Sequence, residues 1–318
     1  MNDTSKIVDS ESARVSAAIV IPAFNAAATI VETLCAVQAC PGVGKLGGVF
    51  VCDDASTDNT SKLAANAWIG VPKLTILQNE QRLGERNTVN AAFKRLRNNY
   101  EWIFILHADD VVKENWLDLY FPRIKSAAPR VASICSSYES WYPDVARVEP
   151  GEDDFTRDLE IIRGARESVL GTLKAGCWWH ISGCAIRVER FFEIGGFQPH
   201  MPQLGDFEWL LRCLKLGYDI EYIPRTTMRY RIHSTSVSSN SFRRGQDLIE
   251  RLELFRNYCD ECFLTKQEFR ILRIKVIYTA LKRMVKQLAA GKLQNCGDLR
   301  SVCWRALRGQ AELFGPST

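Results

Sequence analysis

The stretch IFILHADD, residues 103–110, is an apolar run that ends on one imidazole and two carboxylates. These groups belong to His107, Asp109 and Asp110. Adjacent carboxylates repel each other, and burying them without a partner costs at least about 2 kcal/mol. We therefore expect a positively charged partner at this point of the chain.

Two other apolar runs also end on polar groups. AAIVIPAFN ends on Asn25, and GGVFVCDDAS carries Asp53 and Asp54 near its end. Ligands of a doubly wound sheet gather at the carboxyl ends of its strands, so all three segments are expected to face one crevice. A turn or capping role is the alternative for each of them. Clustered carboxylates favour Mg²⁺ or Mn²⁺, and such a cation favours a phosphate-bearing ligand such as a nucleoside diphosphate.

These residues must be positioned by the elements that carry them. Apolar runs of strand length are each followed by a segment with helical spacing. Near-continuous Val, Ile, Leu and Phe indicate strands covered on both faces, as in a parallel sheet with helical crossovers. The predicted fold is therefore α/β, a Rossmann-like, doubly wound and mainly parallel sheet, with a C-terminal helical extension. The expected strands are 17–25, 47–56, 73–80 and 101–110, and the expected helices are 26–40, 57–68, 85–100 and 113–127.

The composition is that of an ordinary soluble globular protein, with 46% hydrophobic and 25% charged residues in 318. The net charge of +4 is unevenly distributed, because residues 241–318 hold 15 Lys and Arg against 8 Asp and Glu. The first residues lack the pattern of a signal peptide and are expected to form a flexible leader. The longest uncharged stretch, residues 15–31, is interrupted by Pro22 and Asn25, so no transmembrane helix is expected.

Several classes of protein are disfavoured. The eleven cysteines are odd in number and irregular in spacing, which indicates reduced core residues of a cytoplasmic protein. Cys259 and Cys262 form the only close pair, and no second pair lies at zinc-finger distance. The first loop, PAFNAAATI, has neither a G-x-G-x-x-G nor a Walker pattern, which argues against dinucleotide oxidoreductases and P-loop enzymes. No nucleic-acid partner is expected.

Seven blocks of the sequence, taken together, resemble one known family. In chain order they are IPAFN, VCDDASTDNT, NEQRLGERNTVNAAF, ILHADD, SGCAIRVERFFEIGGF, GDFEWLLR and YRIHSTSVS. Their order and spacing resemble the family 2 glycosyltransferases, which are inverting enzymes with the GT-A fold. The resemblance spans about residues 17–239. It implies transfer of a sugar from a nucleotide diphosphate sugar, a UDP-sugar first of all, to an acceptor hydroxyl. The acceptor would be a saccharide or lipid-linked saccharide in cell-surface polysaccharide or glycolipid synthesis.

The resemblance implies a nucleotide site in the first half of the chain. The loop that matches Ala23 and Asn25, together with Asp54, holds the base and ribose in the family. Asp54 would accept a hydrogen bond from a ring N–H, as a carboxylate can. Arg86 and Asn87 match a pair that supports this site, with a solvated arginine as the alternative.

The resemblance also implies a metal site. HADD fills the place of the Asp-x-Asp motif, so Asp109 matches the metal-binding carboxylate and the cofactor would be Mn²⁺ or Mg²⁺. His107 replaces the first Asp, and a neutral imidazole can still accept a hydrogen bond or ligate a metal. A histidine satisfied near a turn is the alternative. In the closing segment, His233 is expected at the metal and Arg229 or Arg231 at a phosphate, unless the segment is an ordinary polar connector.

The catalytic base implied by the resemblance is Asp206. GDFE matches a Glu-Asp-x-Glu/Asp pattern in which Gly205 replaces the preceding acid. The apolar spacing of residues 207–214 puts Asp206 at a helix N-terminus, where the dipole and free N–H groups stabilise a carboxylate. An N-cap aspartate is the alternative. Glu208 is expected to assist binding of the acceptor or to orient the site.

Trp178, Trp179 and His180, in the stretch AGCWWHISG, are candidates for the sugar or acceptor pocket. Aromatic faces pack well against the C–H surface of sugars, and the indole N–H adds a donor. Core packing is the alternative for all three.

Three regions follow from these interpretations: a flexible leader at 1–14, a GT-A domain at 15–240 and a basic helical region at 241–318. The last region contains an expected helix with apolar residues along one face and basic residues elsewhere. Such a helix can lie on an anionic membrane, here at its inner face, near a lipid-linked acceptor. Packing against the catalytic domain or another subunit is the alternative. The apolar positions are Ile274, Ile277, Leu281, Val285 and Leu288.

Two rival functions stay open at this level. A nucleotide-sugar-binding protein without catalysis would account for His107 and Gly205, and predicts UDP binding without turnover. A nucleotidyltransferase predicts release of pyrophosphate from a nucleoside triphosphate. Neither explains Asp206 as well as glycosyl transfer does.

Overall fold

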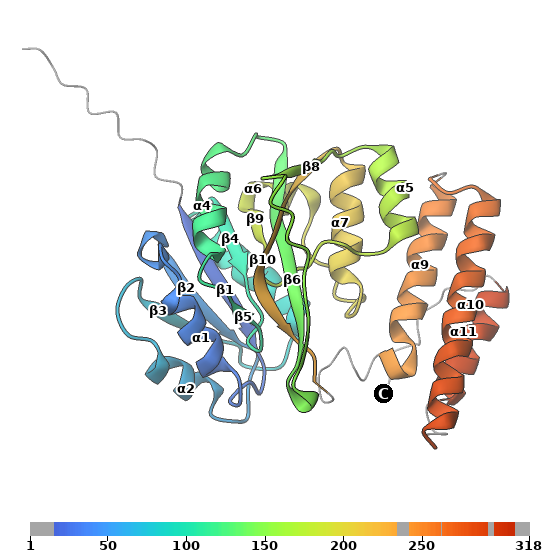
Figure 1. The fold of residues 1–318 in the computed structure, drawn as a ribbon, viewed down its shortest axis with the longest axis horizontal. Coiled ribbons are helices and arrows are strands. Elements are labelled where there is room, and N and C mark those ends of the chain that lie inside the picture. Colours follow the sequence, from blue (N-terminus) through green and yellow to red (C-terminus); the bar gives the residue numbers. More distant parts are fainter. Residues whose placement is uncertain (1–15, 234–241, 262, 292–295, 309–318) are drawn as a thin grey trace, which may run out of the picture.

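A single sheet organises the part of the chain that the computed structural model describes, which is residues 16–233, 242–261, 263–291 and 296–308 (Figure 1). Its strand order is β3-β2-β1-β4-β9-β6-β10-β5, with β7 beside β6 and β8 beside β10. The leader expected at 1–14 lies outside the described residues. The strands are β1 (Ala17–Ala23), β2 (Gly48–Asp53), β3 (Leu74–Gln78), β4 (Trp102–Ile105), β5 (Val111–Val112), β6 (Val131–Tyr142), β7 (Arg147–Glu149), β8 (Glu160–Ile162), β9 (Ala185–Arg187) and β10 (Asp219–Arg231).

The first half of the sheet is parallel, as predicted. β1 lies between β2 and β4 and is parallel to both, and β2 is parallel to β3. β1 and β4 are buried at every position, which agrees with their continuous apolar sequences. The second half is mixed, because β9 pairs antiparallel with β4 and β6, while β6 and β10 are parallel to each other. The α/β class with a mainly parallel doubly wound sheet is thereby confirmed.

Helices cover both faces of this sheet (Figure 1). One face packs against α1, α2 and α4 through residues such as Leu34, Ala64 and Trp116. The other face packs against α3, α6 and α7 through residues such as Phe93 and Phe191. The helices are α1 (Ile30–Ala39), α2 (Thr60–Ala67), α3 (Glu85–Leu96), α4 (Trp116–Ser126), α5 (Arg166–Ala175), α6 (Val188–Ile194), α7 (Gly205–Lys215), α9 (Gln246–Asp260), α10 (Lys266–Ala289) and α11 (Cys296–Arg308), with 3₁₀ turns η1 (Val43–Lys45) and η2 (Pro143–Val145).

The C-terminal region is helical and stacks outside α5 and α7 (Figure 1). Its buried residues, among them Leu252, Val276 and Val302, belong to the same apolar cluster as the residues beneath α3 and α7. Two hydrogen bonds of 2.7 and 2.8 Å from Arg283 to Asp247 tie α10 to α9. Among the described helices, none has the length and apolar character needed to cross a membrane.

Candidate active site

The site lies where β1, β2 and β4 end. Ala23, the last residue of β1, pairs with Asp53 at the end of β2. The pairing continues past the strands, because the backbone N–H of Asp54 donates to the carbonyl of Ala23 at 2.8 Å. The segments that follow the three strands therefore leave the sheet at one edge, as expected from the sequence.

Asn25 joins the first of these loops to the second. Its side-chain oxygen accepts a hydrogen bond from Thr57 N, and its own N–H donates to Ser56 Oγ, both at 2.9 Å. The neighbouring ring of Phe24 lies 3.9 Å from the guanidinium of Arg82, which is a cation–π contact. Phe24 and Arg82 were not singled out from the sequence, although an aromatic residue beside Asn25 was a usable signal. This pair of loops offers an aromatic face and amide groups to a planar ligand.

Asp54 organises the loop that precedes α3. Its Oδ1 accepts hydrogen bonds from Leu83 N, Asn79 Nδ2 and Thr88 Oγ1 at 2.7–2.9 Å, and its Oδ2 accepts one from Gly84 N at 2.8 Å. Burial would raise the pKa of Asp54, but these hydrogen bonds outweigh it and lower the pKa. Because four protein donors already engage the carboxylate, only Oδ2 keeps capacity for a ligand.

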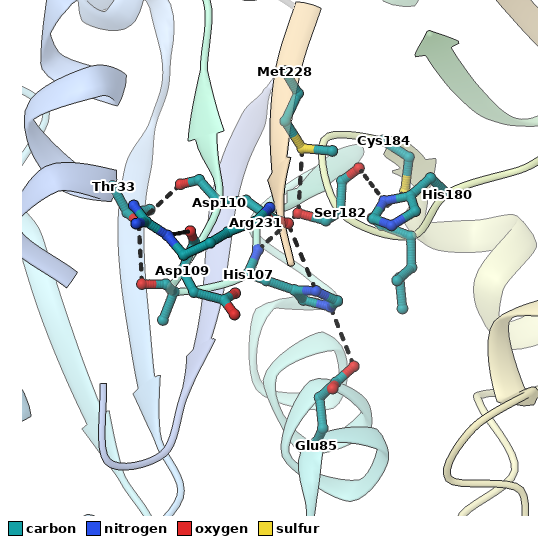
Figure 2. A network of polar contacts seen from close by, with 12 residues as sticks. Thr33, Glu85, His107, Asp109, Asp110, His180, Ser182, Cys184, Met228 and Arg231 are labelled. Carbon is teal, nitrogen blue, oxygen red and sulfur yellow. Dashed lines mark hydrogen bonds and ion pairs between the residues drawn. The ribbon is translucent and has the colours of Figure 1, made fainter. Parts of the chain in front are cut away.

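His107, Asp109 and Asp110 form the cluster at the end of β4 (Figure 2). One ligand atom from each of the three side chains lies within 4.8 Å of the others. The turn that holds them is fixed to α1, because the one hydroxyl hydrogen of Thr33 is shared between the carbonyls of residues 108 and 110, which lie 3.0 and 2.8 Å from Oγ1. His107 is held from the other side by Ser182, whose Oγ accepts the backbone N–H of His107 at 3.0 Å.

Asp110 is completely buried in this cluster. Its Oδ1 accepts the backbone N–H of Arg231 at 2.9 Å, whereas its Oδ2 has no hydrogen-bond partner among the described residues. Burial first, and then the neighbouring carboxylate of Asp109, raise the pKa of Asp110 to about 7. A buried carboxylate oxygen without a donor is costly unless something positive occupies the site.

His107 supplies the positive charge that the sequence predicts beside the two carboxylates. Its Nε2 lies 3.2 Å from Glu85 Oε1 at the start of α3, and its Nδ1 lies 3.8 Å from Asp110 Oδ2 (Figure 2). Burial opposes protonation of the imidazole, but Glu85 and then Asp110 raise the pKa of His107 to about 9. The imidazole is therefore protonated at neutral pH and must lose this proton before it can ligate a metal. Glu85 was not foreseen as a partner of His107.

The residues of the cluster fit a divalent cation. Two carboxylates and an imidazole are suitable ligands for a metal such as Mn²⁺, and Oδ2 of Asp110 is a buried acceptor that no hydrogen bond from the described residues engages. His233, expected at the metal, brings its Nε2 to 3.4 Å from Asp109 Oδ2. The rest of that closing segment, residues 234–238, lies outside the described residues.

The two arginines of the closing segment have protein partners. Arg231 donates from Nε to the carbonyl of Asp109 at 2.7 Å and forms an ion pair with Glu32 on α1. Arg229 forms an ion pair with Glu139 on β6. Arg231 thus anchors the end of β10 to the cluster.

Asp206 lies at the second position of α7, where the sequence placed it, and its side chain is 20% exposed. Arg86 Nη2 lies 3.9 Å from Asp206 Oδ1, and Arg86 Nη1 lies 3.0 Å from Glu85 Oε1. A continuous row of alternating charges therefore runs from Asp206 through Arg86 and Glu85 to His107. Arg86 is itself buried, so it is a fixed part of this row rather than a solvated side chain.

An aromatic wall stands beside the cluster, and only its histidine was singled out from the sequence. The ring of His180 lies 4.7 Å from Tyr138 and 4.6 Å from Tyr230 between ring centroids. It also lies 6.4 Å from His107 (Figure 2). Burial and then the positive charge of His107 lower the pKa of His180 to about 4, so this imidazole is neutral. The three rings come from β6, β10 and the turn before β9, and no local sequence pattern predicts that they lie close together.

Three expected pocket residues have structural partners instead. Trp179 is 1% exposed, stacks on Trp209 at 5.2 Å and donates to Ser133 Oγ, so its indole belongs to the core. Trp178 donates to Thr172 Oγ1 of α5 and packs against the same core. Glu208 accepts two hydrogen bonds from Arg212, which also binds the carbonyls of residues 194–196. These contacts favour core packing, the alternative that the sequence left open for the tryptophans, and they pair Glu208 with its own helix.

The chain is similar to known proteins in sequence. Residues 18–163 match the family described as Glycosyl transferase family 2. The curated protein Glycosyltransferase GlyG of Streptococcus pneumoniae serotype 4 is 22% identical over 297 residues, which are 90% of this chain and 93% of that protein.

Two solved structures show the same fold at low sequence identity. Residues 1–349 of S. aureus TarS, in complex with UDP-GlcNAc, superpose with a TM-score of 0.56 at 15% identity, over 93% of each chain. The mannosyltransferase PcManGT from Pyrobaculum calidifontis, in complex with GDP-Man and Mn²⁺, superposes with a TM-score of 0.55 at 19% identity, over 92% of this chain and 80% of that one. The chain has the fold of the GT-A glycosyltransferases. Within that class, its residues 18–163 are similar to family 2, and the curated relative is also a glycosyltransferase.

Proposed function

We propose that this glycosyltransferase moves a sugar from a nucleoside diphosphate sugar, a UDP-sugar first of all, to an acceptor hydroxyl with inversion at the anomeric carbon. The observation that carries the proposal is the row of charges from Asp206 through Arg86 and Glu85 to His107, beside Asp109. It connects a carboxylate able to accept a proton with a cluster able to hold a cation. The complexes of TarS with UDP-GlcNAc and of PcManGT with GDP-Man and Mn²⁺ support the donor class.

In this proposal Asp206 is the general base. It removes the proton of the acceptor hydroxyl as the oxygen attacks the anomeric carbon from the side opposite the leaving diphosphate. Arg86 holds the carboxylate in place through its charge, and Glu85 fixes Arg86. No covalent intermediate with the enzyme is needed, because one in-line displacement inverts the configuration.

The donor is held at the strand ends. Asn25 and Asp54, with Ala23 beneath them and Phe24 beside them, bind the base and ribose, while Asp109, Asp110, His107 and His233 are the residues that would hold Mn²⁺ or Mg²⁺. When bound, such a cation supplies positive charge that offsets the charge developing on the diphosphate. Tyr138, His180 and Tyr230 offer aromatic surface to a sugar, which is the role the sequence suggested for His180 together with Trp178 and Trp179.

The acceptor in this proposal is a saccharide, free or linked to a lipid, in the synthesis of a cell-surface polysaccharide or glycolipid. The enzyme would act in the cytoplasm, in peripheral contact with the inner face of the membrane through its C-terminal helices. The basic residues of this region support that contact.

A donor panel tests the proposed reaction. The protein is incubated with UDP-, GDP- and dTDP-sugars in Mn²⁺, Mg²⁺ or EDTA, and release of the nucleoside diphosphate is followed by chromatography. One donor class should be hydrolysed slowly without acceptor and faster with added saccharides, and NMR of the product should show inverted anomeric configuration. Tight UDP binding without turnover of any donor would instead indicate a binding protein that has lost catalysis.

A further inference from the structure

The outer side of α10 exposes a row of apolar side chains. We name it the α10 stripe, and its members are between 49% and 68% exposed. Ile277, expected on this face from the sequence, packs instead against the apolar core. The members of the α10 stripe are Ile271, Ile274, Tyr278, Leu281, Val285 and Leu288.

The members of the stripe follow each other at intervals of three and four residues, so they form one continuous line along the helix. From residue 271 to residue 288 this line is about 26 Å long at 1.5 Å per residue. Six large apolar side chains in one line exceed the scattered exposure that is normal on a protein surface. α10 lies at the outer edge of the molecule, away from the sheet (Figure 1).

The charges along the stripe have a single sign. Arg270, Lys275, Lys282 and Lys286 are exposed on this helix, and the sequence from residue 269 to residue 289 contains no Asp or Glu. Two other basic residues of the helix are used inside the molecule, since Arg273 donates to carbonyls at the end of α11 and Arg283 pairs with Asp247. The exposed cations therefore flank the stripe, and no acidic residue of α10 beyond residue 268 neutralises them.

This charge pattern argues against a second copy of the chain as the partner. Intervals of three and four residues are also those of a coiled-coil seam, in which flanking positions of opposite charge pair across the interface. Here the flanking positions 270, 275 and 282 are all basic. Two copies joined along the stripe would place like charges side by side, which is destabilising.

The same pattern fits an anionic lipid surface. A helix that lies in the plane of a membrane combines an apolar face with flanking Lys and Arg, and an aromatic residue such as Tyr278 is favoured at the interface. The neighbouring helix α11 adds exposed Trp304 and Leu307, together with exposed Arg308. Two adjacent helices of this composition suit a broad surface better than the groove of a single protein partner.

We propose that the α10 stripe and its flanking cations dock this enzyme on a bilayer rich in anionic phospholipid, with α10 lying parallel to the surface. This inference deepens the membrane contact of the proposed function by naming the face, its anchors and the lipid chemistry. Because binding to vesicles is measured without turnover, its failure leaves the glycosyl transfer reaction untouched, and a failed donor panel leaves the docking untouched.

The test is flotation of the full-length protein with vesicles of phosphatidylcholine, with or without an equal share of phosphatidylglycerol. We expect binding to the anionic vesicles to be at least about tenfold stronger, and to weaken at 0.5 M salt. The double variant Ile274→Ser with Val285→Ser should lose about tenfold or more in affinity, because two apolar anchors are removed. The triple variant Lys275→Gln, Lys282→Gln, Lys286→Gln should lose about as much on anionic vesicles only.

Matched controls separate docking from general surface effects. Ile69→Ser with Val71→Ser removes the same two residue types where they are 82% and 78% exposed, and should bind like the unaltered protein. Lys62→Gln, Lys73→Gln and Lys94→Gln remove three exposed lysines elsewhere. Circular dichroism and donor hydrolysis verify that each variant is folded. Equal flotation of the stripe variant and the unaltered protein would overturn the proposal, as would a stripe-dependent dimer that binds neither kind of vesicle.

Discussion

Arg86 approaches Asp206 across the backbone of Gly205. Its Nη2 lies 3.9 Å from Asp206 Oδ1, and a Cβ built on Gly205 would come within 2.9 Å of Arg86 Nε and 3.4 Å of its Cδ. The missing side chain at 205 is what allows a buried guanidinium to lie against the first turn of α7. In the Glu-Asp-x-Glu/Asp pattern that this segment resembles, an acidic residue precedes the aspartate. Here Gly205 replaces that residue and leaves room for Arg86.

Gly205→Ala should therefore reduce turnover more than it reduces donor binding. The added methyl forces Arg86 away from Asp206, and small misplacements of catalytic groups cost up to about 100-fold in rate. We expect kcat to fall between about 10- and 100-fold, with KM for the donor within about threefold of the original. Steady-state kinetics with the donor found in the panel measures both values.

Gly171→Ala is the matched control for that substitution. Gly171 lies within α5, and a Cβ there meets nothing within 4 Å. Alanine at an exposed helix position is favoured over glycine by about 1 kcal/mol, so this variant should be as active as the original and slightly more stable. If both glycine variants kept full activity, the contact between Arg86 and Asp206 would have no role in turnover.

Asp206→Asn should abolish most of the activity without disturbing the nucleotide site. An amide cannot accept the proton of the acceptor, and a general base contributes about 10²–10⁴-fold to the rate. We expect kcat to fall by that factor while the Kd for UDP, measured by calorimetry, stays the same. Asp158→Asn, which changes a carboxylate that is 87% exposed elsewhere, serves as the control. Turnover close to the original in the Asp206 variant would remove this residue from the proposed mechanism.

Asp110→Asn tests whether the buried cluster holds a cation. The amide can still accept the backbone N–H of Arg231 through Oδ1, but it replaces Oδ2, which no hydrogen bond within the described part of the chain engages, with an NH₂ group that cannot ligate a metal. We expect the affinity of the variant for Mn²⁺, measured by electron paramagnetic resonance, to fall at least about tenfold. In the original protein, we expect EDTA to reduce turnover. Asp109→Asn should have a similar effect. Unchanged Mn²⁺ titration in both variants would contradict a metal site at these residues.

The parallel half of the sheet could be predicted because its signals are local. The strands that contain residues 17–23 and 102–105 are continuous apolar runs, and the helices after them have a 3.6-residue spacing, so chain order alone brought Asn25, Asp54 and His107 to one edge. The position of Asp206 at the start of α7 was equally local. Each of these features depends on fewer than about 15 neighbouring residues, which is the range over which periodicity is informative.

The partners of those residues could not be predicted in the same way. Glu85 meets His107 from another element, and Arg86 meets Asp206 from a helix 120 positions away in the sequence. The antiparallel strand β9, which inserts between β4 and β6, is three residues long and carries no distinctive alternation. Contacts of this kind are fixed by tertiary packing, which a one-dimensional pattern does not contain.

The environment of Trp179 could not be predicted either, because the sequence around a tryptophan beside a motif is the same whether the indole lies in a core or in a pocket. The structure buries its indole against Trp209 and Ser133. Trp179→Ala should therefore destabilise the fold by about 3–5 kcal/mol in urea unfolding. Trp178→Ala, at a partly exposed position, should cost less. A Trp179 variant of normal stability with a raised KM for the donor would return this residue to the pocket.

Glu250 links the C-terminal helices to the catalytic helix. It lies on α9, is fully buried, and its Oε2 accepts the backbone N–H groups of Gln203 and Leu204 at 3.0 and 2.7 Å, directly before α7. Burial raises the pKa of Glu250 from 4.5 to about 7. Between these two values the folded protein holds a proton that the unfolded chain has released, so this group makes the fold less stable as pH rises from 4.5 to 7.

Glu250→Gln should remove that loss, because the amide oxygen can accept the same two N–H groups and does not ionise. A shift of this size corresponds to a change on the order of 3 kcal/mol. The free energy of unfolding of the variant, minus that of the original protein, should therefore be larger at pH 8 than at pH 5 by about that amount. Urea denaturation at both pH values measures it. Glu167→Gln, at an exposed position on α5, controls for the loss of one carboxylate. If the difference in the free energy of unfolding between Glu250→Gln and the original protein were the same at both pH values, the buried carboxylate would not titrate in this range. Its two hydrogen bonds alone would then account for the way it holds the start of α7.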